Sequence, residues 1–171
     1  FAEVERAIRS GLFDTLGHLD VVKKFVIEHI PPAAFAAAPE VYEPALRALV
    51  EAGMGLEVNA SGLRHAPGET YPAPWVVARF RELGGEVVTT GSDAHLPPSF
   101  AHGLATAYGI AARAGFREVA VRRRPGDPPA GEREAIPARF LDAAAARPPG
   151  GDKAAGVVGE PGPNIAGRTS L

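Results

Sequence analysis

An aspartate and a histidine two residues apart are the side chains of this chain best suited to metal chemistry. They are Asp93 and His95 in the segment 91–95 (GSDAH), which directly follows residues 86–90 (EVVTT). This β-branched run predicts a short buried strand. A carboxylate oxygen and an imidazole nitrogen suit Zn, Mn or Fe better than Ca. A solvated turn with a helix-capping Asp93 would give the same pattern, and the pair alone does not decide between the two.

Two earlier runs add further polar groups at predicted strand ends. Residues 12–17 lead to His18, a third candidate ligand, and residues 54–58 lie between this run and the segment 91–95. Side chains alternate along a strand, which predicts one face bearing Asp14, Leu16, His18, Glu57, Asn59, Thr89 and Asp93. The opposite face would be apolar, with Phe13, Leu56, Val58 and Val88. Polar groups at strand ends, with the apolar face of each strand covered by helices, are typical of the catalytic face of a (β/α) barrel.

The strands predicted to carry these residues alternate with predicted helices along the chain. The helices are expected at 2–9, 19–29, 40–52, 73–83 and 99–114, the strands at 12–17, 54–58, 86–90 and 116–121, and loops at 59–72 and 91–98. Such βα alternation indicates a parallel sheet covered by helices. Four strands are too few to close a barrel of the usual eight. We therefore expect an amino-terminal part to be missing from this chain, which begins with Phe1 and not Met.

The carboxyl-terminal stretch 125–171 differs in composition from residues 1–124. It is rich in Pro, Gly and Ala and poor in large apolar side chains, which predicts a disordered or loosely attached tail. A short helix is expected near 137–146. A short interaction motif inside the tail stays open.

Overall composition excludes several classes of function. With a net charge of −2 over 171 residues, no basic face is expected to bind nucleic acid. The chain has no cysteine, so disulfides and thiolate metal sites are excluded, which fits a cytoplasmic location. No apolar run approaches the roughly 20 residues that span a membrane, and no signal peptide is visible.

Three motifs together resemble the polymerase-and-histidinol-phosphatase (PHP) family, most closely its histidinol-phosphatase branch. They are Gly17-His18-Leu19-Asp20 followed by Lys23-Lys24-Phe25, then residues 56–64 with Tyr71-Pro72, then the segment 91–95. Their order and spacing are similar to those of the family over about residues 1–121. The family's H-x-H metal motif and its early Glu and His ligands are absent. The resemblance therefore implies an α/β fold that is the carboxyl-terminal part, residues 1–124, of a distorted (β/α)7 barrel, with the missing amino-terminal half as a candidate partner.

The resemblance also implies roles for individual residues. Up to three divalent transition-metal ions (Zn, Mn or Fe) are expected in the intact family site, with His18, Asp93 and His95 as ligands here and with Asp93 and His95 as catalytic residues. The expected substrate-binding residues are Arg64, Lys24, Ser61, Asn59 and Glu57. A guanidinium such as that of Arg64 offers a planar fork of donors that fits phosphate oxygens.

Several of these roles have ordinary alternatives. Lys24 is equally well explained as a solvated charge, and Glu57 could orient a ligand histidine or pair with a substrate cation. Asp20 is predicted to cap the following helix. His65 is expected at the surface of the 59–72 loop, and whether it approaches substrate stays open.

The activity implied by the resemblance is hydrolysis of a small phosphate ester by metal-activated water. The substrate would be L-histidinol phosphate, giving L-histidinol and phosphate in histidine biosynthesis, and this chain alone is expected to be inactive. Two alternatives remain: a PHP-type phosphoesterase acting on a nucleotide or DNA end, and a non-catalytic remnant that lacks the amino-terminal metal motif.

Overall fold

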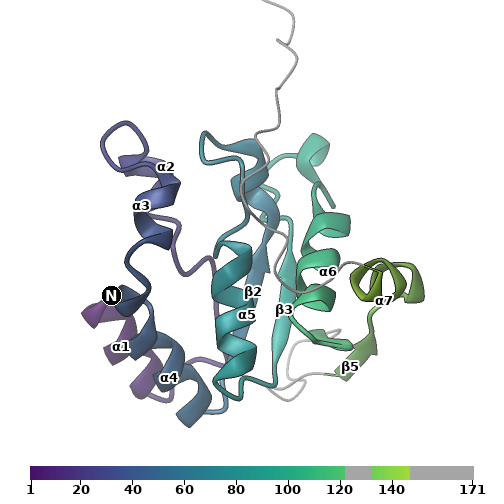
Figure 1. The fold of residues 1–171 in the computed structure, drawn as a ribbon, viewed down its shortest axis with the longest axis horizontal. Coiled ribbons are helices and arrows are strands. Elements are labelled where there is room, and N and C mark those ends of the chain that lie inside the picture. Colours follow the sequence, from purple (N-terminus) through teal and green to yellow (C-terminus); the bar gives the residue numbers. More distant parts are fainter. Residues whose placement is uncertain (122–131, 147–171) are drawn as a thin grey trace, which may run out of the picture.

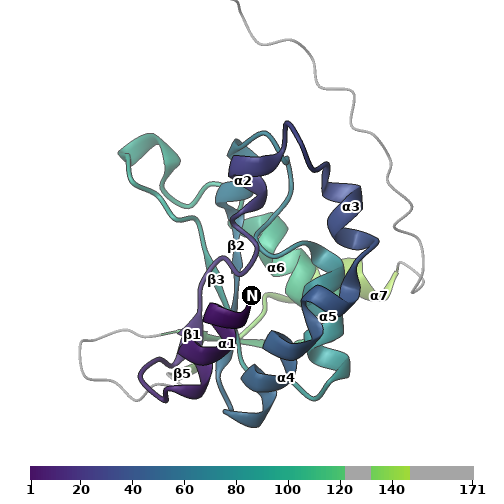
Figure 2. The ribbon, with the colours of Figure 1, turned by 90° about the vertical axis from the view of Figure 1, so that its left-hand side faces the viewer.

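A small parallel sheet with helices on one face forms the centre of the protein (Figures 1 and 2). The computed structural model describes residues 1–121 and 132–146. The parallel sheet has the order β1-β2-β3, with β1 at Thr15–Leu16, β2 at Gly55–Asn59 and β3 at Val88–Gly91. The α/β class is thereby confirmed. The described residues form this sheet and a separate two-stranded sheet, with no closed barrel among them, and the relation to a barrel stays a prediction.

Helices, turns and two further described strands surround this parallel sheet. The longer helices are α1 (Ala2–Arg9), α4 (Glu43–Glu51), α5 (Pro74–Glu82), α6 (Leu104–Arg113) and α7 (Ala138–Ala145), and the short ones are α2 (Lys23–Val26) and α3 (Pro32–Ala36). The described residues also form the 3₁₀ turns η1 (Pro39–Val41), η2 (Ala60–Arg64) and η3 (Pro97–Ser99) and the strands β4 (Glu118–Val121) and β5 (Glu132–Ala135). Within the described ranges, no helix is long and apolar enough to cross a membrane.

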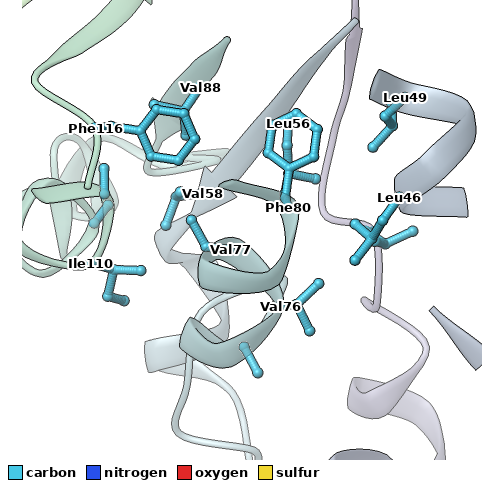
Figure 3. Close-up of a cluster of buried hydrophobic side chains, with 14 of the residues drawn as sticks. Leu46, Leu49, Leu56, Val58, Val76, Val77, Phe80, Val88, Ile110 and Phe116 are labelled. Carbon is cyan, nitrogen blue, oxygen red and sulfur yellow. The ribbon is translucent and has the colours of Figure 1, made fainter. Parts of the chain in front are cut away.

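The apolar core lies between the sheet and helices α4, α5 and α6 (Figure 3). Leu56 and Val58 of β2 and Val88 of β3 are completely buried, as is Phe80 of α5. Burying a side chain of this size contributes about 1.5–3 kcal/mol, so this layer accounts for much of the stability. The apolar face predicted from alternation is confirmed at these three strand positions but is wrong for Phe13, which is 56% exposed.

The register of β1 also differs from the prediction. Leu16 pairs with Leu56, and paired residues of parallel strands lie on the same face of the sheet. Leu16 therefore lies on the apolar face, and its predicted placement beside Glu57 is wrong. A slip of one residue moves every side chain of a strand to the other face, and counting alternation within one run cannot detect such a slip.

Helix boundaries were predicted well where the pattern was long and poorly next to glycine and proline. Helix α1 has the predicted bounds, whereas the helix expected over 19–29 is continuous only over Lys23–Val26. The helix expected over 99–114 begins at Leu104, because Gly103 has a φ of +74°. A left-handed residue cannot belong to a right-handed helix, so the helix starts after it.

Strand β4 was expected in the parallel sheet, and this prediction is wrong. It pairs antiparallel with β5 in a separate two-stranded sheet, with Val119 opposite Glu134. Its partner comes from the stretch that was predicted to be a tail, so the local pattern before residue 121 could not reveal the pairing.

Residues 132–146 belong to the fold, so the predicted tail over 125–171 is wrong for this part. Ile136 is 2% exposed and its N–H donates to the carbonyl oxygen of Arg117 at 2.8 Å. Ile136 precedes α7, and Phe140 and Ala144, four residues apart on one face of that helix, pack against the core. The expected short helix near 137–146 is confirmed as α7. Residues 125–131 and 147–171 of the predicted tail lie outside the described residues.

The packing of Ile136 can be tested by truncation. We expect Ile136→Ala to lower the free energy of unfolding by about 2–4 kcal/mol, because it removes buried methyl groups and leaves a cavity. Leu12→Ala is the matched control, since Leu12 is 79% exposed and its loss should cost less than about 0.5 kcal/mol. Urea unfolding followed by circular dichroism measures both. Equal effects of the two variants would contradict the packing of residues 132–146 on the core.

Candidate functional site

The predicted site residues gather at the carboxyl ends of the three parallel strands. Gly17 and His18 follow β1, Asn59 ends β2 and Gly91 ends β3. Because parallel strands end at the same edge of a sheet, side chains from distant parts of the sequence meet there.

The carboxylate of Glu57 lies at the centre of this edge. Its Oε2 accepts the backbone N–H of His18 at 3.1 Å and the side-chain amide of Asn59 at 3.0 Å. Gly17 and Gly91 flank the carboxylate, and an added Cβ at Gly91 would overlap Glu57 Oε1. The two glycines therefore leave the room that the carboxylate occupies, and Glu57 links the end of β1 to β2.

The D-x-H segment is held by Arg64. Its Nη1 donates to the carbonyl oxygen of Ser92 at 2.9 Å and its Nη2 to that of Asp93 at 3.1 Å. Asp93 has a φ of +48°, and its Oδ1 lies 3.3 Å from His95 Nε2. The predicted pair therefore is together in space, with the His95 side chain 87% exposed.

A complete metal site is not formed by the described residues alone. Within 1–121 and 132–146, no group of three or more His, Asp or Glu side chains could hold a metal ion. Asp93 and His95 are two donors, whereas a zinc ion takes three or four protein ligands. His18 is exposed and has a φ of +30°. The metal roles of these three residues stay predictions.

Positive charge gathers around the half-buried imidazole of His65. Burial lowers the pKa of His65, repulsion from Lys24 and Arg64 lowers it further, and the Asp93 carboxylate opposes these effects. The two predicted phosphate-binding cations, from α2 and η2, thus act on one imidazole beside the D-x-H segment.

The predicted substrate-binding residues Asn59 and Ser61 have structural contacts in the turn that follows β2. Asn59 Oδ1 accepts the backbone N–H of Ser61 at 2.9 Å and so caps η2. Both residues are 2% exposed. Their proposed contacts with substrate stay predictions.

A buried ionic cluster beside the site was missed by sequence reasoning. Lys23 is completely buried, and its Nζ lies 2.8 Å from Asp20 Oδ2 and 2.5 Å from Glu69 Oε1. Tyr42 Oη and the N–H of Ala73 also donate to Asp20 Oδ2, at 3.2 and 3.3 Å. Burial raises the pKa of Asp20, and Lys23 opposes that rise.

This cluster ties α2 to the segment 69–73. Asp20 is therefore an ion-pair partner, and its predicted role as a helix cap is wrong, since α2 has no side-chain cap. The spacing of three residues between Asp20 and Lys23 was the available signal, because it allows an ion pair within one helical turn. The sequence offers two adjacent lysines and does not show which one is buried.

The fold and the strand-end residues define an α/β protein with candidate anion-binding and metal-binding side chains at one edge of a parallel sheet. No protein-family model matches the chain. The chain is 40% identical to the probable histidinol-phosphatase of Deinococcus radiodurans over 124 residues, which are 72% of this chain and 45% of that protein.

Two further relatives have similar names. The probable histidinol-phosphatase of Thermotoga maritima is 38% identical over 93 residues, 54% of this chain and 37% of that protein. The histidinol-phosphatase of Lactococcus lactis is 28% identical over 108 residues, 63% of this chain and 40% of that protein. The chain thus spans less than half the length of the curated relatives it matches.

The buried cluster predicts unequal effects of the two neighbouring lysines. Lys23→Met should lower the free energy of unfolding by about 3–5 kcal/mol, because it leaves Asp20 buried without a cation. Lys24→Met, on an exposed side chain, should cost less than about 0.5 kcal/mol. Adding Asp20→Asn to Lys23→Met should restore part of the loss, since the completely buried side chain at position 20 then carries no charge. Urea unfolding of the three variants checks this, and similar losses for both lysines would refute it.

Proposed function

We propose that this chain forms part of a metal-dependent phosphomonoesterase of the histidinol-phosphatase type, which cleaves L-histidinol phosphate to L-histidinol and phosphate. The observations that support the proposal are the hold of Arg64 on the backbone of Asp93 and the action of the Lys24 and Arg64 charges on the His65 imidazole beside it. The names of the three relatives support the choice of substrate.

Arg64 keeps donors for a phosphate group although it also holds the D-x-H segment. A guanidinium has five N–H donors, and two of them are used by the carbonyl groups of Ser92 and Asp93. Three donors remain, and Lys24 adds a second positive charge. Together they would hold the non-bridging phosphate oxygens and offset the negative charge that develops during hydrolysis.

The metal would supply activated water when bound. We assign Asp93, His95 and His18 as its ligands in this chain. The described residues lack a three-ligand group, so we expect the chain alone to bind Zn²⁺ or Mn²⁺ weakly, because loss of ligands removes most of the affinity of a metal site. The same observation favours a non-catalytic role as the second candidate.

Phosphate release from L-histidinol phosphate tests the proposal. This chain would be assayed with Mn²⁺ or Zn²⁺, alone and co-expressed with the part of the Deinococcus radiodurans relative that it does not match. We expect release only from the combination, and a loss of at least about 100-fold with Asp93→Ala, in the range seen when a metal-site residue is removed. His102→Ala, on an exposed side chain outside the site, is the matched control.

A binding measurement keeps the test decisive if the two parts do not assemble. Calorimetry of the chain alone should show that L-histidinol phosphate binds and that L-histidinol does not. Binding should weaken about tenfold in Arg64→Ala, as expected for a charge-assisted contact. Absence of activity in every mixture together with absence of phosphate-dependent binding would favour the non-catalytic candidate.

A further inference from the structure

Tyr71 holds a fixed position on the buried side of the 59–72 segment. It is completely buried, and its backbone exchanges two hydrogen bonds with Asn59 at the end of β2, both of 2.9 Å. Lys23 Nζ lies 5.6 Å from the centroid of its ring. The tyrosine ring is thereby anchored to the sheet and to the buried ionic cluster.

His65 stacks on this anchored ring. The two ring centroids are 6.1 Å apart with an interplanar angle of 25°, and Tyr71 Oη lies 3.4 Å from His65 Nδ1. Within the same turn, the N–H of His65 donates to the carbonyl oxygen of Gly62 at 3.1 Å. A Cβ on Gly62 would overlap the carbonyl oxygen of Glu69, so the turn that carries His65 packs closely on the segment before Tyr71.

The protonation of the pair follows from its surroundings. Burial raises the pKa of Tyr71 to about 12, so its hydroxyl keeps its proton at neutral pH and can donate to Nδ1. Burial and the neighbouring cations Lys24 and Arg64 lower the pKa of His65, which favours a neutral imidazole. A neutral imidazole that accepts at Nδ1 carries its proton on Nε2.

From this geometry we infer that His65 is a third phosphate-binding side chain, which donates from Nε2–H to a phosphate oxygen held by Lys24 and Arg64, and that Tyr71 is its positioning residue. The inference rests on the proposed phosphate site. It deepens that proposal by giving the site a neutral donor, which binds phosphate oxygens without adding a third charge to two cations that already repel each other. The ligand class is a phosphomonoester dianion or inorganic phosphate.

Nuclear magnetic resonance of the histidine side chains tests the inference on the 171-residue chain. Long-range ¹H–¹⁵N spectra report the tautomer of each imidazole, and a titration with inorganic phosphate reports binding. We expect the Nε2–H tautomer for His65 before phosphate is added, and a shift of its ring signals during the titration. Tyr71→Phe keeps the stacked ring, removes the hydroxyl, and should produce a mixture of tautomers.

Three variants separate the contributions to phosphate affinity. His65→Phe keeps a ring on Tyr71 but removes the donor, and should weaken phosphate binding about three- to tenfold, the range for one hydrogen bond. Lys24→Met should weaken it by a similar factor or more. His102→Phe, outside the site, should leave it unchanged.

The outcomes distinguish this inference from the proposed function. Binding that depends on Lys24 but is unchanged in His65→Phe would overturn the role of His65 and leave the phosphate site in place. An Nδ1–H tautomer in the unmodified chain would overturn the positioning by Tyr71. No saturable phosphate binding in the unmodified chain would overturn the proposed phosphate site, and the inference with it.

Discussion

The carboxylate of Glu57 is the contact on which the strand-end region depends. It lies between two glycines and accepts hydrogen bonds from the backbone after β1 and from the side chain that ends β2. Strand β1 has only two residues, so few ladder hydrogen bonds hold it, and the bond from His18 to Glu57 continues the attachment beyond the strand. A half-buried carboxylate with two donors is satisfied, and it sets the position from which the His18 segment leaves the sheet.

Two cations extend this polar framework to the other loops. Arg64 attaches η2 to the backbone of the D-x-H segment, and buried Lys23 attaches α2 to the segment around Glu69. The apolar core packs helices, among them α4 and α5, against the sheet. The relative placement of the candidate site residues is therefore decided by charged side chains and their partners, whereas the core decides the placement of the helices.

Sequence patterns predicted those parts whose signal is local. The runs around Leu56 and Val88 and the periodic helices α1 and α5 could be located, and the polar residues were correctly expected at strand ends. The register of β1, the pairing of β4 and the burial of Lys23 could not, because each depends on a partner distant in sequence: Leu56, β5 and Glu69. The role of Ile136 was hidden by the Pro- and Gly-rich composition around it.

The left-handed backbone at His18 and Asp93 has a consequence for how this protein tolerates change. Each residue lies just after a strand and has a positive φ. This backbone conformation costs free energy for every residue type except glycine. Replacement by glycine would relieve that strain while deleting the imidazole and the carboxylate. If variants were selected for thermal stability alone, glycine would therefore tend to replace His18 and Asp93. The imidazole and the carboxylate would be kept only if the variants were also selected for binding of their ligand.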